Sequence, residues 1–169
     1  MAILRMRGMM LAMALAAGLC AGAPGRAGAD QPITVYKDAN CGCCAKWIEH
    51  INAHGIAARA IDLDAGALAE RKRELGIAPR MQSCHTGVTA EGLIFEGHVP
   101  ATSMTRFLAA HPSGARGLAV PGMPPGSPGM EMGDRFVPYS VWQLNADGGV
   151  AAFEEIENRG AQYAPERRP

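Results

Sequence analysis

Three cysteines lie within four residues, at the point where a predicted strand passes into a predicted helix. Residues 33–36 are rich in β-branched and aromatic side chains, which favours a strand. After a polar turn, a helix is predicted to begin near Gly42 or Cys43 and to end at Gly55. The apolar residues that recur at helical spacing within it are Cys44, Trp47, Ile48 and Ile51. The segment Cys41-Gly42-Cys43-Cys44 is therefore expected at the N-terminus of this helix.

The chain then alternates between strand-like and helix-like segments. The predicted order is strand 56–61, helix 64–75, strands 82–88 and 93–96 joined as a hairpin, and helix 101–110. With the first strand and helix, this gives β-α-β-α-β-β-α, the thioredoxin-like order of an α/β (α+β) fold. Proteins of that fold place a cis proline near their active cysteines, and Pro79 is the residue expected in that place. Helix 64–75 carries Lys72 between two arginines in its last turns, where the helix dipole favours basic residues.

The C-terminal part of the chain has a different composition. Residues 120–133 contain four prolines and four glycines, which predicts an irregular loop. Strand-like segments at 136–144 and 150–153 follow and predict a β-hairpin. A flexible linker is the alternative reading of the loop, but structure is predicted on both sides of it. From residue 157 onward the chain is polar and is predicted to be a disordered tail.

The first 29 residues have the features of a secretory signal peptide. A short basic region with Arg5 and Arg7 precedes an apolar run at 9–19 that is too short to span a bilayer. Small residues at 27–29 predict cleavage after Ala29 and export to the periplasm. We do not expect a lipoprotein anchored at Cys20, because Leu19 occupies the position where a small residue is needed.

The predicted mature chain is long enough for one domain with one sizeable core, which we place at residues 30–156. Without the three arginines of the signal peptide, it carries 13 basic and 16 acidic side chains. There is no basic stripe, so nucleic acid is not an expected partner. There is also no second long apolar run, so the mature protein is not expected to enter a membrane.

The four cysteines of the predicted mature chain are unevenly placed for a disulfide framework. Three crowd into residues 41–44 and the fourth is Cys84, whereas stapling cysteines would be spread to close long loops. Cys41 and Cys44 have the C-x-x-C spacing of a redox pair, and a helix N-terminus lowers a thiol pKa. They are the catalytic candidates if the protein exchanges disulfides. Whether the chain is an enzyme therefore stays open.

Cys43 is a thiol that a plain disulfide exchanger does not need. Three neighbouring sulfurs can converge on soft Cu(I) or bridge several Cu(I) ions, so metal handling is the favoured interpretation. Zinc is the minor alternative, since a structural zinc site draws ligands in two separated pairs and Cys84-His85 would supply the second. An inert structural cluster is a third interpretation.

Cys84 is the favoured fourth sulfur, because the strand predicted at 82–88 would run beside the cysteine cluster. Successive strand residues point to opposite faces, so only one of Cys84 and His85 is expected to face the cluster. In the alternative, Cys84 forms a disulfide with one of the other three cysteines. Further candidate ligands, each with an ordinary packing or solvent-exposed role as the alternative, are His85, His98, Met81, Met123, Met130 and Met132.

Four segments in a fixed order carry a family resemblance. They are Cys41-Gly42-Cys43-Cys44 followed by a tryptophan, Pro-Arg-Met-Gln-Ser-Cys-His-Thr at 79–86, Glu-Gly-His-Val-Pro-Ala at 96–101, and Val-Pro-Gly-Met-Pro-Pro-Gly-Ser-Pro-Gly-Met-Glu at 120–131. Over residues 33–153 the chain resembles the small exported bacterial family, formerly of unknown function, that includes the copper-resistance protein CopG.

This resemblance implies a thioredoxin-like fold and a copper-resistance function in the periplasm. It implies copper bound at the Cys-x-Cys-Cys site, with redox cycling between Cu(I) and Cu(II). It supports Cys41, Cys43, Cys44 and Cys84 as ligands or bridging sulfurs, and it makes the Pro/Gly loop with its methionines a shaped element. The expected partners are copper ions and the periplasmic proteins that handle copper or exchange electrons.

Overall fold

The computed structural model describes residues 31–163, so the predicted signal peptide, its cleavage site and Cys20 lie outside the described residues. The elements along the chain are β1 (Ile33–Lys37), α1 (Gly42–Ala53), β2 (Ala58–Asp62), α2 (Ala65–Glu74), the 3₁₀ turn η1 (Pro79–Met81), β3 (His85–Val88), β4 (Ile94–Glu96), α3 (Ala101–Ala110), β5 (Ala115–Ala119), β6 (Tyr139–Asn145), β7 (Val150–Ile156) and the 3₁₀ turn η2 (Ala161–Tyr163). Within this part of the chain, none of the helices is long and apolar enough to cross a membrane.

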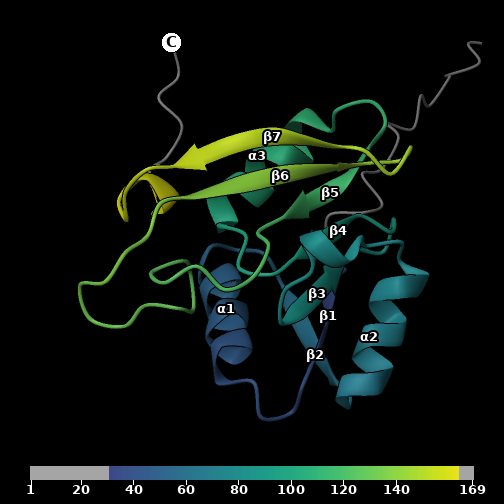
Figure 1. The fold of residues 1–169 in the computed structure, drawn as a ribbon, viewed down its shortest axis with the longest axis horizontal. Coiled ribbons are helices and arrows are strands. Elements are labelled where there is room, and N and C mark those ends of the chain that lie inside the picture. The colour runs from purple at the N-terminus through teal and green to yellow at the C-terminus, as the bar shows by residue number, and fades with distance from the viewer. Residues whose placement is uncertain (1–30, 164–169) are drawn as a thin grey trace, which may run out of the picture.

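The seven strands form one mixed sheet in the order β2-β1-β3-β4-β5-β6-β7. The β1–β2 and β4–β5 pairs are parallel, and the other neighbours are antiparallel. Helices α1 and α2 flank the β1–β3 end on opposite sides, and α3 lies behind β6 and β7 in Figure 1. The predicted mixed α/β class, the order β-α-β-α-β-β-α and the C-terminal hairpin are confirmed.

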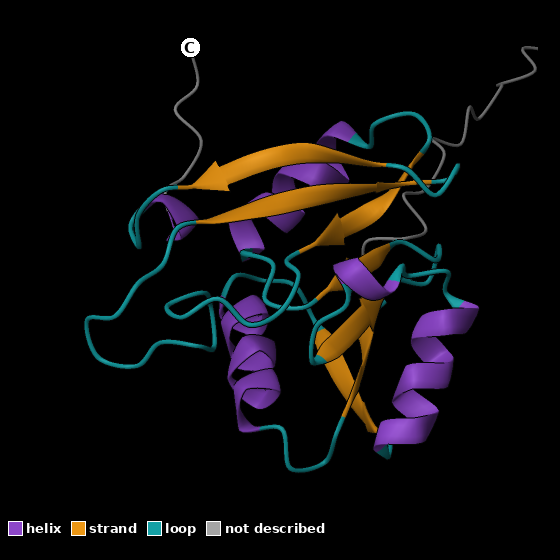
Figure 2. Cartoon of the chain, viewed as in Figure 1, coloured by secondary structure: helices purple, strands orange, loops and turns teal. Residues whose placement is uncertain are grey.

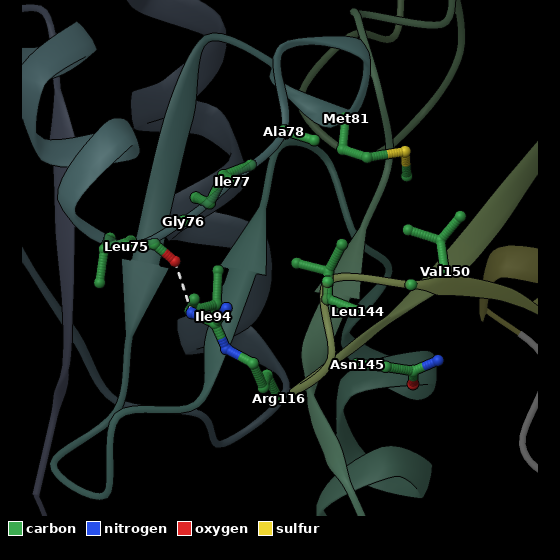
Figure 3. Close-up of a pocket in the computed structure, with 12 residues that line it drawn as sticks. Leu75, Gly76, Ile77, Ala78, Met81, Ile94, Arg116, Leu144, Asn145 and Val150 are labelled. Atoms are coloured by element: carbon green, nitrogen blue, oxygen red, sulfur yellow. Dashed lines mark hydrogen bonds between the residues drawn. The ribbon is translucent and has the colours of Figure 1, made fainter.

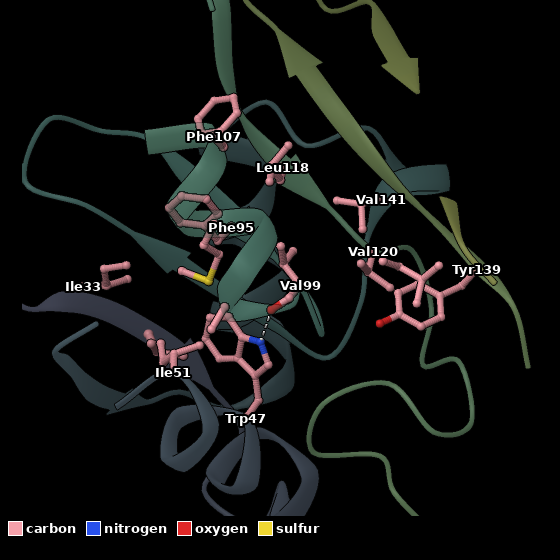
Figure 4. Packing of buried hydrophobic residues seen from close by; sticks show 14 residues of the cluster. Ile33, Trp47, Ile51, Phe95, Val99, Phe107, Leu118, Val120, Tyr139 and Val141 are labelled. Carbon is pink, nitrogen blue, oxygen red and sulfur yellow. Dashed lines mark hydrogen bonds between the residues drawn. The ribbon is translucent and has the colours of Figure 1, made fainter. Parts of the chain in front are cut away.

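The main core lies between the sheet and helices α1 and α3 (Figure 4). Trp47 and Ile51 of α1 are fully buried, as is Phe107 of α3, because the helical spacing places them on the inner face. The indole Nε1–H of Trp47 also donates a hydrogen bond of 2.8 Å to the Val99 carbonyl. This bond ties α1 to the segment that leads into α3.

Three details differ from the sequence prediction. Strand β5 was not predicted, because the segment Ala115–Ala119 contains Arg116 and Gly117 and lacks β-branched residues. Strand β3 begins at His85, three residues later than predicted. Pro79 opens η1, and there is no cis peptide bond among residues 31–163, so the cis-proline prediction is wrong.

The prediction of a disordered tail from residue 157 is also wrong for the residues up to Tyr163. Residues 161–163 form η2, in which the Gln162 side chain is fully buried. Its amide Nε2 donates to the Gly126 carbonyl at 3.0 Å, and its Oε1 accepts from the Tyr139 hydroxyl at 2.8 Å. These bonds join the C-terminal turn to the Pro/Gly loop. Residues 164–169 lie outside the described residues.

Candidate metal centre

The four cysteines predicted as ligands converge at the N-terminus of α1. Cys41 is the residue before the helix, and Cys43 and Cys44 lie in its first turn. Cys84 comes from the irregular segment just before β3. All four Sγ atoms lie within 4.8 Å of one another, with 3.5 Å from Cys41 to Cys43 and 3.9 Å from Cys43 to Cys84. Sequence neighbours and a residue 40 positions away thus form one four-sulfur set.

Two of these cysteines are oxidised in the structure. Cys41 and Cys44 form a disulfide, and their Cα atoms lie 5.3 Å apart. Cys43 and Cys84 are free thiols in the described part of the chain. The C-x-x-C pair named as the redox candidate is therefore the pair that the structure joins. The alternative in which Cys84 pairs with one of the other cysteines is not the state observed.

Two histidines extend the set on the other side of Cys84. Its Sγ lies 3.3 Å from His85 Nδ1 and 3.1 Å from His98 Nε2, and these three residues form a second group able to hold a metal ion. Of the pair Cys84 and His85, only Cys84 belongs to the four-sulfur set, as expected, whereas His85 belongs to the second group. The expectation rested on strand alternation, but Cys84 in fact precedes β3.

His98 is held in the form that a metal ligand requires. Its Nδ1 lies 2.8 Å from the Pro128 carbonyl oxygen. Because a carbonyl can only accept a hydrogen bond, Nδ1 must carry the proton and donate it. The Nε2 atom therefore carries its lone pair toward Cys84. Burial lowers the pKa of His98, against a smaller opposing effect of the Pro128 bond, so the ring is neutral near pH 7.

Burial also sets the protonation of the other two members of this group. It lowers the pKa of His85 well below its ordinary value, with smaller contributions from His98 and Lys72. It raises the pKa of Cys84 to about 12, and the neighbouring Cys43 adds to the rise. Without a metal ion, Cys84 is therefore a neutral thiol at pH 7. A bound metal would have to displace that proton.

The Pro/Gly loop closes over these groups; we call residues 120–133 the strap. Figure 2 shows it as an irregular segment that passes beside α1. Its Pro128 carbonyl binds His98, and the Gly122 amide donates to the Gln82 carbonyl at 3.1 Å. Gly129 (φ +87°) packs so closely on α1 that a Cβ there would lie 2.7 Å from the Cys43 carbonyl oxygen. The strap is thus a shaped wall of the site.

The candidate methionines lie in different surroundings. Met81 is buried in a second apolar cluster and lines a small cavity with residues such as Ile77 and Leu144 (Figure 3), which favours packing as its role. Met130 is partly buried in the strap, whereas Met123 and Met132 are 50% and 67% exposed. Metal ligation by the three methionines of the strap stays a prediction.

Sequence reasoning missed a buried polar cluster behind Cys84. The Lys72 ammonium is 4% exposed and the Glu96 carboxylate is fully buried, with 2.5 Å between Nζ and Oε1. Lys72 also donates to the Thr86 hydroxyl at 2.7 Å, and that hydroxyl donates to Glu96 Oε2 at 2.5 Å. In the sequence Lys72 lies among exposed-looking charges, and its partner is 24 residues away. No local signal could have found this pair.

The comparisons with known proteins give one family and two similar solved structures. A family described as "Protein of unknown function, DUF411" matches residues 81–130, which contain Cys84, both histidines and most of the strap. Two solved structures titled copper resistance protein CopG, Form 1 and Form 2, are similar to this chain at 42% and 41% identity, with TM-scores of 0.68 and 0.67. Each comparison covers 75% of this chain, and 98% and 99% of the respective solved chains. The chain belongs to the DUF411 family that includes CopG.

Family membership confirms the resemblance stated from the four sequence segments. The likeness to the two CopG structures covers 75% of this chain, a longer part than residues 81–130 matched by the family. No curated protein matches the sequence.

Proposed function

We propose that this protein binds copper in copper resistance, and that Cys41, Cys43, Cys44 and Cys84 hold the ion as Cu(I). The observation that carries the proposal is the convergence of four sulfurs within 4.8 Å. Soft thiolate ligands select Cu(I), whereas Mg²⁺ and Ca²⁺ prefer oxygen. The solved relatives are titled copper resistance proteins, which supports copper as the ion.

The histidines add nitrogen ligands to the same site. Cys84 belongs to both the four-sulfur set and the group with His85 and His98. A thiolate can bridge two ions, so this shared sulfur favours a site with more than one copper ion. Four thiolates also satisfy zinc, which stays the alternative metal. Element analysis of protein purified without added metal distinguishes the two.

The disulfide makes copper binding dependent on the redox state. The Cys41–Cys44 bond must take up two electrons and two protons before all four sulfurs are available. An external dithiol supplies both and becomes a disulfide itself. In the oxidised protein, Cys43 and Cys84 are the two members of the four-sulfur set that remain as thiols. We therefore expect the reduced protein to bind more copper, and more tightly, than the oxidised protein.

A competition titration against bicinchoninate, which absorbs visibly when it holds Cu(I), tests the proposal. The reduced wild-type protein should withdraw more than one Cu(I) per chain from the complex. Cys43→Ser should lower the affinity at least tenfold, whereas His54→Gln, at the exposed residue that follows the end of the same helix, should leave it unchanged. A reduced protein that withdraws no copper would refute the function.

A second function, thiol–disulfide exchange, is favoured by the Cys41–Cys44 disulfide at a helix N-terminus. A partner thiolate would attack one sulfur of this bond and release the other as a thiolate. The partner's second thiol would then resolve the mixed disulfide, leaving Cys41 and Cys44 reduced. Insulin reduction in the absence of metal tests this function. It should survive Cys43→Ser, because Cys43 lies outside the exchanging pair.

We also propose that the protein works in the periplasm, with periplasmic copper-handling or redox proteins as partners. The signal-like residues 1–29 carry this part of the proposal. Fractionation of cells that express the full chain, followed by N-terminal sequencing, should find the protein in the periplasm with Asp30 as its first residue. A full-length protein in the cytoplasm would contradict it.

A further inference from the structure

Cys84 lies on a segment that individual hydrogen bonds, rather than a helix or a strand, hold in position. Residues 82–84 fall between η1 and β3, so neither a helix nor a strand ladder fixes them. The Ser83 amide, one residue before Cys84, donates a hydrogen bond of 2.6 Å to Glu96 Oε1. The Ser83 hydroxyl binds the Gly122 carbonyl of the strap. A displacement of Ser83 would therefore move Cys84.

Glu96 is itself fixed from the far side of the sheet. Its Oε1 accepts from both Ser83 and the Lys72 ammonium of α2, and its Oε2 accepts from the Thr86 hydroxyl. With these three donors bound, the carboxylate has one orientation that satisfies them all. The fully buried Glu96 thus links helix α2 to the segment that carries the central thiol of the site.

We propose that Glu96 is a positioning residue for Cys84, acting through the Ser83 amide, and that Lys72 serves to hold the Glu96 carboxylate in place. A buried ion pair is weak evidence for a stabilising role, because well-packed apolar replacements often leave stability unchanged. The Ser83 contact gives this pair a specific task. The inference rests on the proposed function only for its copper measurement, since the placement of the thiol can be measured without metal.

Two matched double variants separate the hydrogen bond between the Ser83 amide and Glu96 from the ion pair between Lys72 and Glu96. Lys72→Met with Glu96→Gln removes both charges but leaves an amide oxygen to accept from Ser83 and an amide N–H to donate to Thr86. Lys72→Met with Glu96→Leu removes the same charges and leaves the Ser83 amide without its acceptor. Gln and Leu are close in size, so the two variants differ mainly in this hydrogen bond.

The first measurement is the alkylation rate of Cys84 by iodoacetamide, followed by mass spectrometry in protein oxidised at Cys41 and Cys44. Cys43, the other free thiol among residues 31–163, is the internal control because it lies on α1 and not on the segment that Glu96 contacts. The Leu variant should label Cys84 at least tenfold faster than the Gln variant, with equal rates at Cys43. Equal Cys84 rates in the two folded variants would overturn the proposal.

A second measurement uses the wild-type protein and keeps the proposal testable if the Leu variant does not fold. Hydrogen exchange at the Ser83 amide should be as slow as at the amides of β3, although residue 83 lies outside any strand. Fast exchange, as at an exposed turn, would overturn the proposal. In the copper titration, the Leu variant should bind Cu(I) at least tenfold more weakly than the Gln variant. If even the wild type binds none, the proposed function fails while the alkylation result still decides the role of Glu96.

Discussion

Gly129→Ala should loosen the wall of the candidate metal site. A Cβ at residue 129 would lie 2.7 Å from the Cys43 carbonyl oxygen and 2.8 Å from the Trp47 nitrogen, both backbone atoms of α1. Ordinary contact begins near 3.4 Å, so the strap must move away from the helix by about 0.7 Å to clear the nearer atom. The move pulls on the adjacent Pro128 carbonyl and its bond to His98.

The expected cost has two parts. An alanine at φ +87° costs about 1–2 kcal/mol of folding free energy. Weakening the buried bond between His98 and Pro128 adds about 1–2 kcal/mol. Gly133→Ala is the matched control, because Gly133 also has a positive φ, +58°, in the strap but would place its Cβ in open space. It should show only the first part.

Urea unfolding followed by tryptophan fluorescence measures both variants. Gly129→Ala should be less stable than Gly133→Ala by about 1–2 kcal/mol, which is about 2–8 °C in Tm for a chain of this length. Its Cu(I) affinity should also fall, whereas that of Gly133→Ala should not. If the two variants lose equal stability and bind copper alike, the strap does not press on α1 as described.

Three further predictions concern single side chains. Burial and the nearby His54 lower the pKa of His50 to about 4, so the unfolded chain takes up a proton first as the pH falls below 6.5. The half-buried ring should make the protein about 1 kcal/mol less stable at pH 5 than at pH 7, and urea unfolding should show a smaller loss for His50→Gln, which does not titrate. Trp47→Phe loses the donor to Val99 and part of a buried ring, and should lower the unfolding free energy by about 2–3 kcal/mol in the same assay. Met132→Leu, at a side chain 67% exposed, should change it by less than about 0.5 kcal/mol, and an unchanged copper stoichiometry in the titration would exclude Met132 as a ligand.

The fold was predictable wherever a local pattern determines the element. Helix α1 follows from apolar residues such as Trp47 and Ile51 on one face, and β1 follows from its β-branched residues. Strand β5 has no such pattern, and its place depends on pairing with β4 and β6, which the sequence does not display. Gly117 lies so close to the Ile94 backbone that no side chain would fit. This need for glycine becomes visible only once β5 is paired with β4.

The site was predictable in its chemistry but less so in its geometry. The apolar periodicity that begins at Cys44 placed the cysteines at a helix N-terminus, and Cys84 and His98 were both among the candidate ligands. Their distance of 3.1 Å depends on a sheet register and a strap that no local pattern describes. His85 was given less weight because the alternation of strand residues was applied to Cys84 and His85 together, although Cys84 precedes β3. Gln162 was assigned to a tail because its burial depends on a tertiary partner, Gly126.

The site is assembled from segments that lie far apart in the chain. Cys41 and Cys84 supply sulfur, His98 supplies nitrogen, and the strap at Gly129 closes over them. No fragment that lacks one of these segments contains the complete set, so under the proposed function the binding of copper would be coupled to the folding of the whole domain. Copper at a hundred times its dissociation constant would add about 2.7 kcal/mol to the free energy of unfolding. The ion would then act as a cross-link between distant parts of the chain. Its removal would lower the melting temperature of the whole domain.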